Sequence, residues 1–349
     1  MTINVLRDTV PWFGKYSGYE GLVGYFSKSV QVTITDRKED LIKKVFGKVY
    51  QIYKGRFDKS PVEIFAELMF IQKIGENDIS HVLYLDGHLD GVKSIQRGRD
   101  KLIGTIHLPI SEWNNEKLQK LESVENVIIL YNEEIGVFSK FIDIKKIHFI
   151  RHGVDISFFK PGDRLLVKKN KILFVGHFLR NFEMFSEVYQ LIQNKTNERI
   201  EFHFIIPSFH RNKGPIQKIQ QLNNIFFHEG LSDEGLLEFY QTSYLLLMPM
   251  SDSGANTAIV QAIATGLPVI TTDVGGVRSY GGGDIFPLIK NDDSQSMAEL
   301  FLQYYNNEVF RNDISEKQRR FAVDHLDWNL IAAQHVEVYE QVKVLHNGL

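Results

Sequence analysis

A short glycine turn after an apolar run holds residues that could bind an anion. In "KILFVGHFLRN", residues 171–181, Gly176 ends the apolar run and is followed by His177 and Arg180. A glycine lets the backbone approach a ligand closely, and a guanidinium can pair with phosphate through two hydrogen bonds. The stretch therefore predicts a phosphate-binding turn, although Arg180 taken alone also fits an ordinary surface arginine.

A second turn lies in "SDSGANTAIVQAIATGLPVITTDVGG", residues 251–276, directly after the apolar run "YLLLMPM". Asn256 and Thr257 are helix-capping residue types, and the apolar residues after them have helical spacing. Gly266 and Pro268 then end the predicted helix. Backbone N–H groups at a helix start favour an anion by roughly 0.3–1 kcal/mol per charge. The pattern fits a ligand-binding strand–turn–helix–strand unit, and equally an ordinary one without ligand.

Two further stretches place chemistry-bearing residues after predicted strands. "FGKYSGYEGL", residues 13–22, puts Gly14 and Gly18 between the first strand and the first helix. "IHLPISEW", residues 106–113, puts His107 at the carboxyl end of a strand. In open α/β sheets ligands bind at the carboxyl ends of the strands, so His107 is as fit for a binding role as for a structural one.

Apolar runs of strand length alternate with helical patterns along the chain, which is typical of parallel sheets with crossover helices. The predicted strands are 3–6, 30–35, 81–85, 102–108, 126–131, 146–151, 171–176, 200–206, 224–229, 243–249 and 268–272. The predicted helices are 20–28, 61–75, 181–194, 232–243, 257–265 and a long amphipathic one over 324–345.

The change of pattern near 155–169 predicts a linker between two domains. The expected boundaries are 1–155 and 156–325, with a closing helix over 326–349. Two doubly wound domains would leave a cleft between the carboxyl ends of their strands, which is the default binding site.

Composition excludes several classes of function. The chain has 349 residues, a formal net charge of −3 and no cysteine, which argues against nucleic-acid binding, disulfides and thiolate chemistry. No Asp-x-Asp pair, Walker loop or Gly-x-Ser-x-Gly elbow is present, so we expect no protein-held metal. The first residues lack a signal-peptide plan, and no apolar run reaches ~18 residues. We expect a cytoplasmic protein.

The order of these stretches resembles the family-4 retaining glycosyltransferases of the GT-B fold. The stretches that carry the resemblance are "RHGVDISFFKPGD", "ILFVGHFLRNFE", "HEGLSDEGLLEFYQTSYLLLMP" and "QAIATGLPVITTDVGG". The similarity covers nearly the whole chain and is strongest over 151–280. It implies an α/β fold of two Rossmann-like, doubly wound domains facing a central cleft, with the last helix crossing back onto the first domain.

The resemblance also implies an activity. A retaining hexosyltransferase would move a sugar from a nucleotide-sugar donor, UDP- or GDP-linked, to a glycan or lipid-linked acceptor, without metal or other cofactor. The domain at 1–155 would hold the acceptor and the domain at 156–325 the donor. Such enzymes serve surface polysaccharide or glycoconjugate synthesis.

Site residues follow from the same resemblance. His107 and Arg180 would be catalytic, since His107 would contact the donor sugar or reacting centre and Arg180 the diphosphate. The expected donor-binding set is Gly18, Gly176, His177, Ser253, Gly254, Ala255, Asn256, Thr257 and Gln261.

The chain departs from the family at two of these positions. The family usually has two glutamates with seven residues between them, where this sequence has Ser253 and Gln261. Gln261 can still bond ribose hydroxyls, and Ser253 is expected to be exposed in the cleft. The loss of both carboxylates supports a rival reading, a catalytically silent GT-B protein that binds a sugar or a partner chain. A GT-B hydrolase or epimerase fits the motifs less well.

One basic stretch stands outside this scheme. Residues 37–56, "RKEDLIKKVFGKVYQIYKGR", hold seven basic and two acidic residues interleaved with apolar ones. They could form a peripheral contact with the inner face of a membrane or with a lipid-diphosphate acceptor. A solvated helix face on a soluble enzyme is the alternative.

Overall fold

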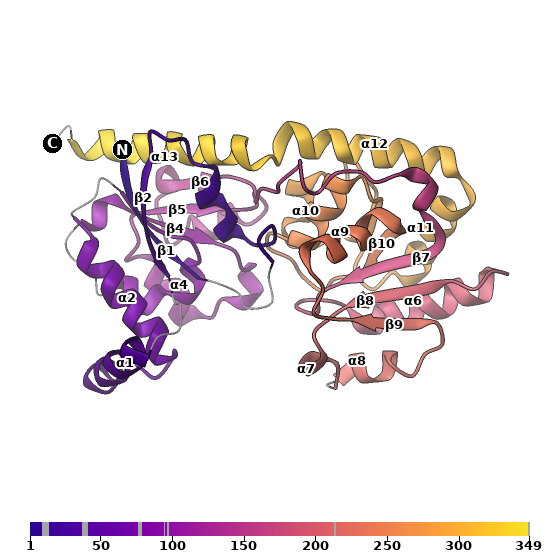
Figure 1. Cartoon of the computed structure of the whole chain (residues 1–349), viewed down its shortest axis with the longest axis horizontal. Helices are drawn as coiled ribbons and strands as arrows, with labels where there is room; N and C mark the ends of the chain where they lie inside the picture. The colour runs from indigo at the N-terminus through magenta and orange to yellow at the C-terminus, as the bar shows by residue number, and fades with distance from the viewer. Residues whose placement is uncertain are drawn as a thin grey trace. The chain divides into compact units, whose positions relative to one another are not determined.

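The computed structural model describes residues 1–8, 14–36, 41–75, 79–93, 95, 98–212 and 214–347, and it contains two α/β units (Figure 1). Unit 1 comprises Met1–Phe13, Gly18–Ile150 and Asn329–Leu349. Unit 2 comprises Gly14–Ser17 and Arg151–Trp328. Each unit is built on a six-stranded parallel sheet, as the alternating pattern predicted.

Unit 1 has the strand order β2-β1-β3-β4-β5-β6. Its strands are β1 (Thr2–Arg7), β2 (Gln31–Asp36), β3 (Ile79–Val82), β4 (Leu102–Ile106), β5 (Asn126–Ile129) and β6 (Ile147–Phe149). Its α-helices are α1 (Leu41–Lys54), α2 (Pro61–Lys73), α3 (Leu89–Lys93), α4 (Asn115–Leu121), α5 (Ile135–Phe138) and, from residue 329, α13 (Trp328–Asn347). Its 3₁₀ helices are η1 (Tyr19–Tyr25), η2 (Leu85–Gly87), η3 (Arg99–Lys101), η4 (Ile110–Glu112) and η5 (Ile144–Lys146).

Unit 2 has the strand order β12-β11-β10-β7-β8-β9. Its strands are β7 (Lys168–Val175), β8 (Glu201–Ile205), β9 (Ile225–His228), β10 (Ser243–Met248), β11 (Val269–Thr272) and β12 (Leu288–Ile289). Its α-helices are α6 (Phe182–Lys195), α7 (Ser208–Arg211), α8 (Gly214–Ile219), α9 (Asp233–Thr242), α10 (Thr257–Thr265), α11 (Ser294–Asn306) and α12 (Glu308–His325). Its 3₁₀ helices are η6 (Arg164–Leu166) and η7 (Gly275–Tyr280).

The order of unit 2 is that of the Rossmann fold, in which the direction of winding reverses between the first and fourth strands. These strands are β7 and β10, which lie side by side and pair in parallel. Loops that leave their carboxyl ends therefore diverge and open a crevice, which is where ligands bind in this fold. Both predicted turns leave the sheet at this point.

The core of unit 2 explains why its strands read as continuous apolar runs. Helices cover both faces of a parallel sheet, so every residue of β10 is buried. Aromatic rings from β7, β8 and α6 interlock beside it, among them Phe174, Phe185 and Phe204, with Phe174 and Phe204 stacked at a centroid distance of 4.5 Å. This packing fixes the strand ends that carry the site.

The secondary structure differs from the prediction in several places, and helices α11 and α12, for example, were not predicted. Residues 20–28, predicted as a helix, contain the 3₁₀ helix η1, which carries Gly21 and Gly24 and follows Gly18 at φ 120°. Strand β12 has only two residues and was not predicted. The closing helix begins at Trp328, later than predicted. The backbone N–H of Trp328 donates to the Val154 carbonyl (3.2 Å), and the N–H of Val154 donates to the turn just before the helix, so these bonds fix where the helix starts.

A buried polar network ties α13 into unit 1. His81 on β3 contacts the Tyr339 hydroxyl through Nδ1 (2.7 Å) and the Thr105 hydroxyl through Nε2 (2.8 Å). Tyr19 contacts His335 Nε2 at 2.5 Å. Burial holds the pKa of His81 well below its usual value and lowers that of His335 to about 4, so both rings are neutral at pH 7.

In the part of the chain that the structure describes, no helix is both long and apolar enough to cross a bilayer.

Candidate functional site

The turns after β7 and β10 are joined by backbone hydrogen bonds. Ser251 N–H donates to the carbonyl of Leu179 (3.0 Å), and Asn181 N–H donates to the carbonyl of Pro249 (2.9 Å). Residues about 70 positions apart in the sequence thus form one short ladder at the switch point of the sheet. The structure therefore brings the predicted phosphate-binding turn after β7 next to the turn that follows β10 and leads to the predicted helix.

The backbone of the first turn has two left-handed residues. Gly176 has φ 80°, and a Cβ placed there would lie 3.2 Å from the Arg180 guanidinium, so the glycine is needed both for its φ and for its lack of a side chain. Leu179 has φ 55°, a conformation that costs a non-glycine residue free energy and that clusters at functional sites. Its carbonyl is thereby held toward Ser251. No sequence pattern indicated this strain.

Arg180 is a positive charge held by neutral acceptors. Its Nε donates to the Val175 carbonyl (3.1 Å), and its Nη1 donates to the Phe178 carbonyl (2.9 Å) and contacts the Met250 sulfur (3.5 Å). Burial lowers its pKa to about 10, so the guanidinium is still charged at pH 7. No carboxylate among the described residues forms an ion pair with it. A fixed cation that carbonyls orient but do not neutralise can bind an anion.

A cavity of about 830 Å³ adjoins this arginine, a volume within the usual range for small-molecule sites. Its lining includes His177, Arg180, Asn181, His210, Ser251 and Asp292. Asn181 caps α6 by accepting from Met184 N–H (2.9 Å), and its amide nitrogen donates to Asp292 (2.9 Å). The amino end of α6 therefore faces the same space as the arginine.

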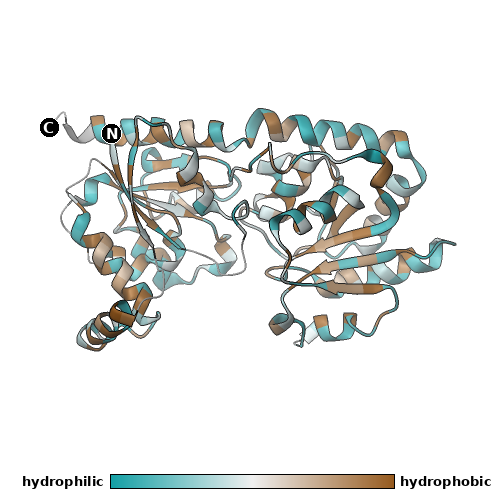
Figure 2. Cartoon of the chain, viewed as in Figure 1, coloured by the Kyte–Doolittle hydropathy of each residue, from teal (hydrophilic) through white to brown (hydrophobic). Residues whose placement is uncertain are grey.

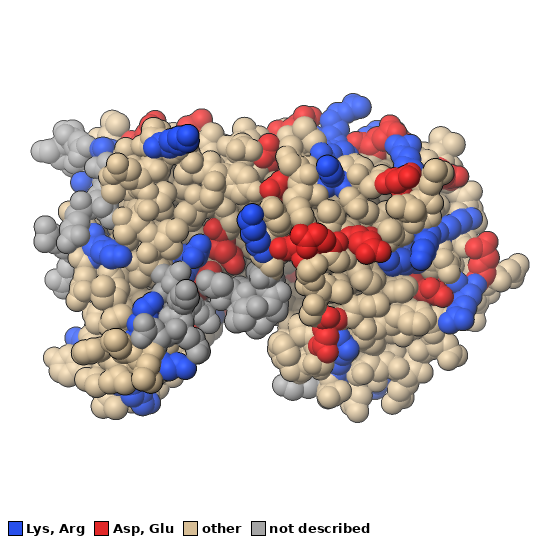
Figure 3. Space-filling model, in the orientation of Figure 1, with Lys and Arg blue, Asp and Glu red and all other residues tan. Residues whose placement is uncertain are grey.

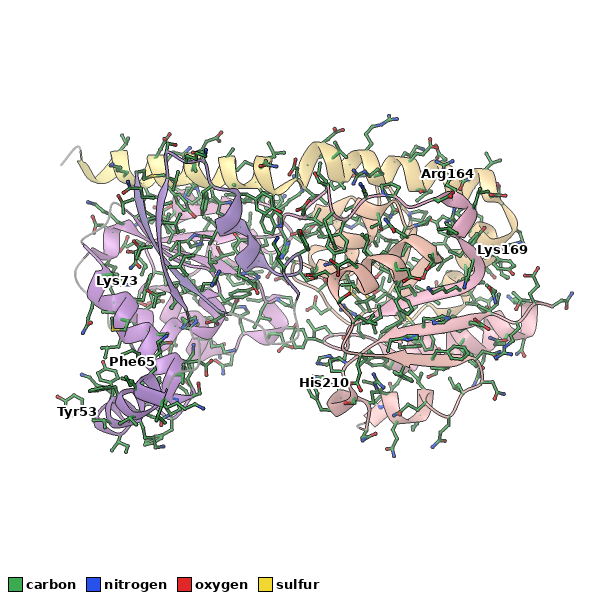
Figure 4. All side chains as sticks on the ribbon, viewed as in Figure 1. Tyr53, Phe65, Lys73, Arg164, Lys169 and His210 are labelled. Atoms are coloured by element: carbon green, nitrogen blue, oxygen red, sulfur yellow. The ribbon has the colours of Figure 1, made fainter. Side chains whose placement is uncertain are left out.

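His177 lines this cavity as a neutral ring. It stacks on His210 of α7 with a centroid distance of 3.4 Å and an interplanar angle of 24° (His210 is labelled in Figure 4). Burial, together with the nearby His210 and Arg180, lowers the pKa of His177 to about 4. His177 can therefore exchange hydrogen bonds but adds no charge at pH 7. The sequence analysis missed His210, which its place just after the carboxyl end of β8 could have indicated.

Ser253 was expected to be exposed, but the structure buries it, with only 3% of the residue accessible. Its hydroxyl donates to the Gly254 carbonyl (2.9 Å), and its own carbonyl accepts from Gly276 N–H (2.7 Å). Gly275, at φ 46°, passes so close that a Cβ there would lie 1.9 Å from the Ser253 carbonyl oxygen. The glycine pair of "DVGG" thus covers the position where the family has its first glutamate.

This burial predicts the effect of restoring the glutamate. Ser253→Glu is expected to destabilise unit 2 by roughly 2 kcal/mol or more, since a carboxylate would be placed in a closed site without a partner. Urea unfolding of the variant, beside Ser157→Glu at an exposed serine of the same unit, measures the difference. Equal unfolding midpoints for the two variants would contradict the packing described here.

The remaining donor-binding candidates lie along the start of α10. Asn256 caps the helix by accepting from Ile259 N–H (3.3 Å), as predicted, and Gly254 and Ala255 precede it in the turn. Thr257 is the first residue of α10. Gln261, one helical turn further, is buried and donates from Nε2 to the Ser17 hydroxyl (2.9 Å). Its predicted contact with ribose requires that this bond be exchanged.

In unit 1, His107 directly follows β4, as predicted, and is held from several sides. Its backbone N–H donates to the Asp86 carboxylate (3.0 Å), and its Nε2 lies 2.7 Å from the Leu83 carbonyl, to which it donates. The ring stacks on Tyr84 with a centroid distance of 4.4 Å. Burial raises the pKa of Asp86 to about 6, against backbone N–H bonds that lower it. The sequence analysis missed both Asp86 and Tyr84.

Gly18 also belongs to unit 1 and has φ 120°, a value that favours glycine. A Cβ there would lie 2.4 Å from the Glu20 carboxylate. The approach of Gly18 and His107 to the residues of unit 2 stays a prediction.

Among the described residues, no cluster of three or more His, Asp or Glu side chains suits a metal ion.

Two doubly wound units, with a glycine turn and a charged arginine at the switch point of the second sheet, define a GT-B protein. Known structures agree: sucrose-phosphate synthase from Thermosynechococcus elongatus matches with a TM-score of 0.70 and 12% identity over 99% of both chains. Anabaena HepE in complex with UDP-glucose matches with a TM-score of 0.73 and 14% identity over 98% of this chain and all of its own.

Residues 156–321 match the family model described as "Glycosyl transferases group 1". A similar characterised protein is the MMP alpha-(1->4)-mannosyltransferase of Mycolicibacterium hassiacum, 23% identical over 203 residues, or 56% of this chain and 49% of that protein. The chain spans 18% to 49% of the curated relatives it matches. The resemblance to the family-4 glycosyltransferases is confirmed.

Proposed function

We propose that the protein is a retaining glycosyltransferase that moves a hexosyl group from a nucleotide-diphosphate donor to a glycan or lipid-linked acceptor. The observation that carries the proposal is Arg180, a partly buried guanidinium that carbonyls orient and that forms no ion pair with a described carboxylate, beside a cavity of about 830 Å³. The diphosphate of a nucleotide sugar would pair with this guanidinium, while Glu183, Glu187 and Asp292 line other parts of the same cavity.

In the proposed reaction the bond between the anomeric carbon and the diphosphate breaks, and negative charge develops on the leaving phosphate. Arg180 would stabilise that charge with preoriented donors, and the amino end of α6 would add its partial positive charge. The acceptor hydroxyl would attack from the face that the phosphate leaves, and the phosphate would take its proton. His177, neutral at pH 7, would bond a phosphate oxygen or a sugar hydroxyl.

Donor and setting belong to the proposal as well. The donor would be UDP- or GDP-linked, and the UDP-glucose bound to Anabaena HepE favours UDP. Since the arginine can meet the diphosphate charge, we propose that no bound metal or other cofactor takes part. His107 would contact the sugar, and Gly18 would let its loop approach the diphosphate. The relatives' names, among them a putative teichuronic acid biosynthesis glycosyltransferase and a mannosyltransferase, favour polysaccharide or glycoconjugate synthesis, and we propose that it takes place at the cytoplasmic face of the membrane.

The test is calorimetric titration of the full chain with UDP, GDP, ADP and dTDP in the presence of EDTA. One nucleotide is expected to bind, and the matching UDP- or GDP-sugars are then assayed for release of nucleotide with candidate acceptors. Failure of all four to bind would overturn the donor site. Loss of binding in EDTA that Mg²⁺ restores would overturn the metal-independent form.

A catalytically silent GT-B protein is the second candidate. It is favoured by the closed first-glutamate position at Ser253 and by the commitment of the Gln261 amide to Ser17. Nucleotide binding without sugar transfer or donor hydrolysis, across both UDP- and GDP-sugars, would select this candidate.

A further inference from the structure

Helix α1 carries its apolar side chains on the outside. The exposed residues recur at helical spacing and are between 56% and 78% accessible: Leu41, Ile42, Val45, Phe46, Val49, Ile52 and Tyr53. Phe57, just beyond the helix, is exposed as well. Figure 2 shows brown, hydrophobic residues along α1, and Tyr53 points away from the ribbon in Figure 4. Single exposed apolar residues are ordinary, but a contiguous stripe marks an interaction surface.

The opposite face of α1, which packs on α2, is not apolar. Its buried positions are Gly47 and Gln51, one helical turn apart. A Cβ at Gly47 would lie 1.8 Å from the Pro61 carbonyl oxygen, so the two helices approach backbone to backbone. Gln51 donates from its amide to the Lys59 carbonyl (2.7 Å). A helix that serves only its own core would turn the apolar stripe inward, and α1 does the reverse.

Lysines border this apolar stripe on both sides. With about 100° of rotation per residue, Lys44 and Lys48 lie on one side of the stripe, and Lys43 and Lys54 lie on the other. Residues 41–54 contain no Asp or Glu. Lys54 Nζ lies 5.1 Å from the centre of the Tyr53 ring, so its charge stays at the border of the apolar surface. Figure 3 shows blue basic side chains among tan ones over this part of unit 1.

We propose that α1 is an interfacial helix that lies in the plane of a bilayer, with its apolar stripe among the acyl chains and its lysines at anionic headgroups. An apolar stripe bordered by lysines is what such a surface requires. With 14 residues, α1 is too short to span a bilayer. The basic residues Arg37 and Lys38 lie outside the described residues and are not needed. The inference goes beyond the proposed transfer reaction and does not depend on it.

Charge argues for lipid rather than for a second copy of the chain. A twofold contact through α1 would bring the four lysines of one helix toward the four of the other, and like charges across an interface are unfavourable. An anionic bilayer offers the opposite charge and an apolar interior together.

The test is sedimentation of the full chain with phosphatidylcholine vesicles that contain or lack phosphatidylglycerol. We expect partition to the anionic vesicles, and a loss of about tenfold or more in the Phe46→Ser/Val49→Ser variant, which removes two large apolar groups from the stripe. Val309→Ser removes an 81% exposed apolar group from α12 in unit 2 and is expected to partition like the wild type. Nucleotide binding should be equal in all three proteins, which keeps this test separate from that of the transfer reaction.

Charge is tested separately. Lys44→Gln/Lys48→Gln is expected to lower partition by roughly tenfold at 0.1 M salt and to respond less to added salt than the wild type. Absence of wild-type partition to anionic vesicles would overturn the proposal. So would a concentration-dependent dimer that the Phe46→Ser/Val49→Ser variant dissociates, since the stripe would then be a contact between copies.

Discussion

The Arg180→Ala variant is expected to bind UDP or GDP at least about tenfold more weakly than the wild type in EDTA, since a hydrogen bond to a charged group is worth roughly 1.5–3 kcal/mol. The effect should be large because the described residues that line the cavity include no lysine or arginine besides Arg180. His177 is neutral there, and the pKa of Arg180 near 10 keeps its charge across the assay range. Isothermal titration calorimetry at pH 7.5 measures the change.

Two controls separate phosphate binding from a loss of structure. Arg180 also orients the carbonyls of Val175 and Phe178, so circular dichroism must show that Arg180→Ala is folded. Arg180→Lys keeps the charge but not the paired donors, and it should fall between the wild type and Arg180→Ala. Arg199→Ala, at an exposed arginine of the same unit, should bind normally. An affinity for nucleotide that Arg180→Ala leaves unchanged would remove this residue from the donor site.

Acid is expected to remove the stability that the neutral ring of His335 contributes to unit 1 between about pH 6.5 and pH 4, against an opposite contribution from Asp86, whose raised pKa of about 6 favours the folded unit as the carboxyl protonates. His335 is buried as a neutral ring whose pKa falls from 6.5 to about 4, and burial lowers the pKa of His81 in the same direction. In this range the unfolded chain binds protons at these histidines that the folded unit does not, so their contribution to stability is full above pH 6.5 and is lost as pH falls. The shift at His335 alone corresponds to roughly 3 kcal/mol.

Urea unfolding followed by circular dichroism at pH 7.5, 6.0 and 5.0 measures this loss. The matched variants are His335→Gln and His325→Gln, the second at an exposed histidine. His335→Gln lacks the titrating ring and should show a smaller difference between pH 7.5 and 5.0, whatever its stability at pH 7.5. His325→Gln should keep the wild-type difference. A pH dependence that His335→Gln does not reduce would contradict the assignment.

Most of the strands and the two turns after β7 and β10 could be predicted because their signals are local. An apolar run flanked by helical pattern needs only its own neighbours to be recognised, and Gly176 marks a turn whatever lies beyond it. The helix start at Asn256 is similar, since capping depends on residues three positions apart. The resemblance to a known family then supplied the roles of these residues, which the patterns left open.

What could not be predicted depends on segments that return from far along the chain. Ser253 is buried because the glycine pair at 275–276 folds back over it. His210 reaches His177 from helix α7, which follows the neighbouring strand β8, and a lone histidine in a sequence gives no sign of its partner. The stripe on α1 shows the same limit, since periodicity reveals an apolar face but not whether that face turns inward.

The network around His81 has a consequence for the order in which the chain folds during synthesis. Unit 1 is the first part of the sequence to be made, yet its core includes Tyr339 and His335 from the last helix. A ribosome releases those residues only after all of unit 2 has been translated. The strands of unit 1 therefore wait without the Tyr339 contact to Nδ1 of His81 while residues 151–328 already have their complete sheet. Unit 2 can finish first, and the carboxyl-terminal helix then closes the unit that began the chain.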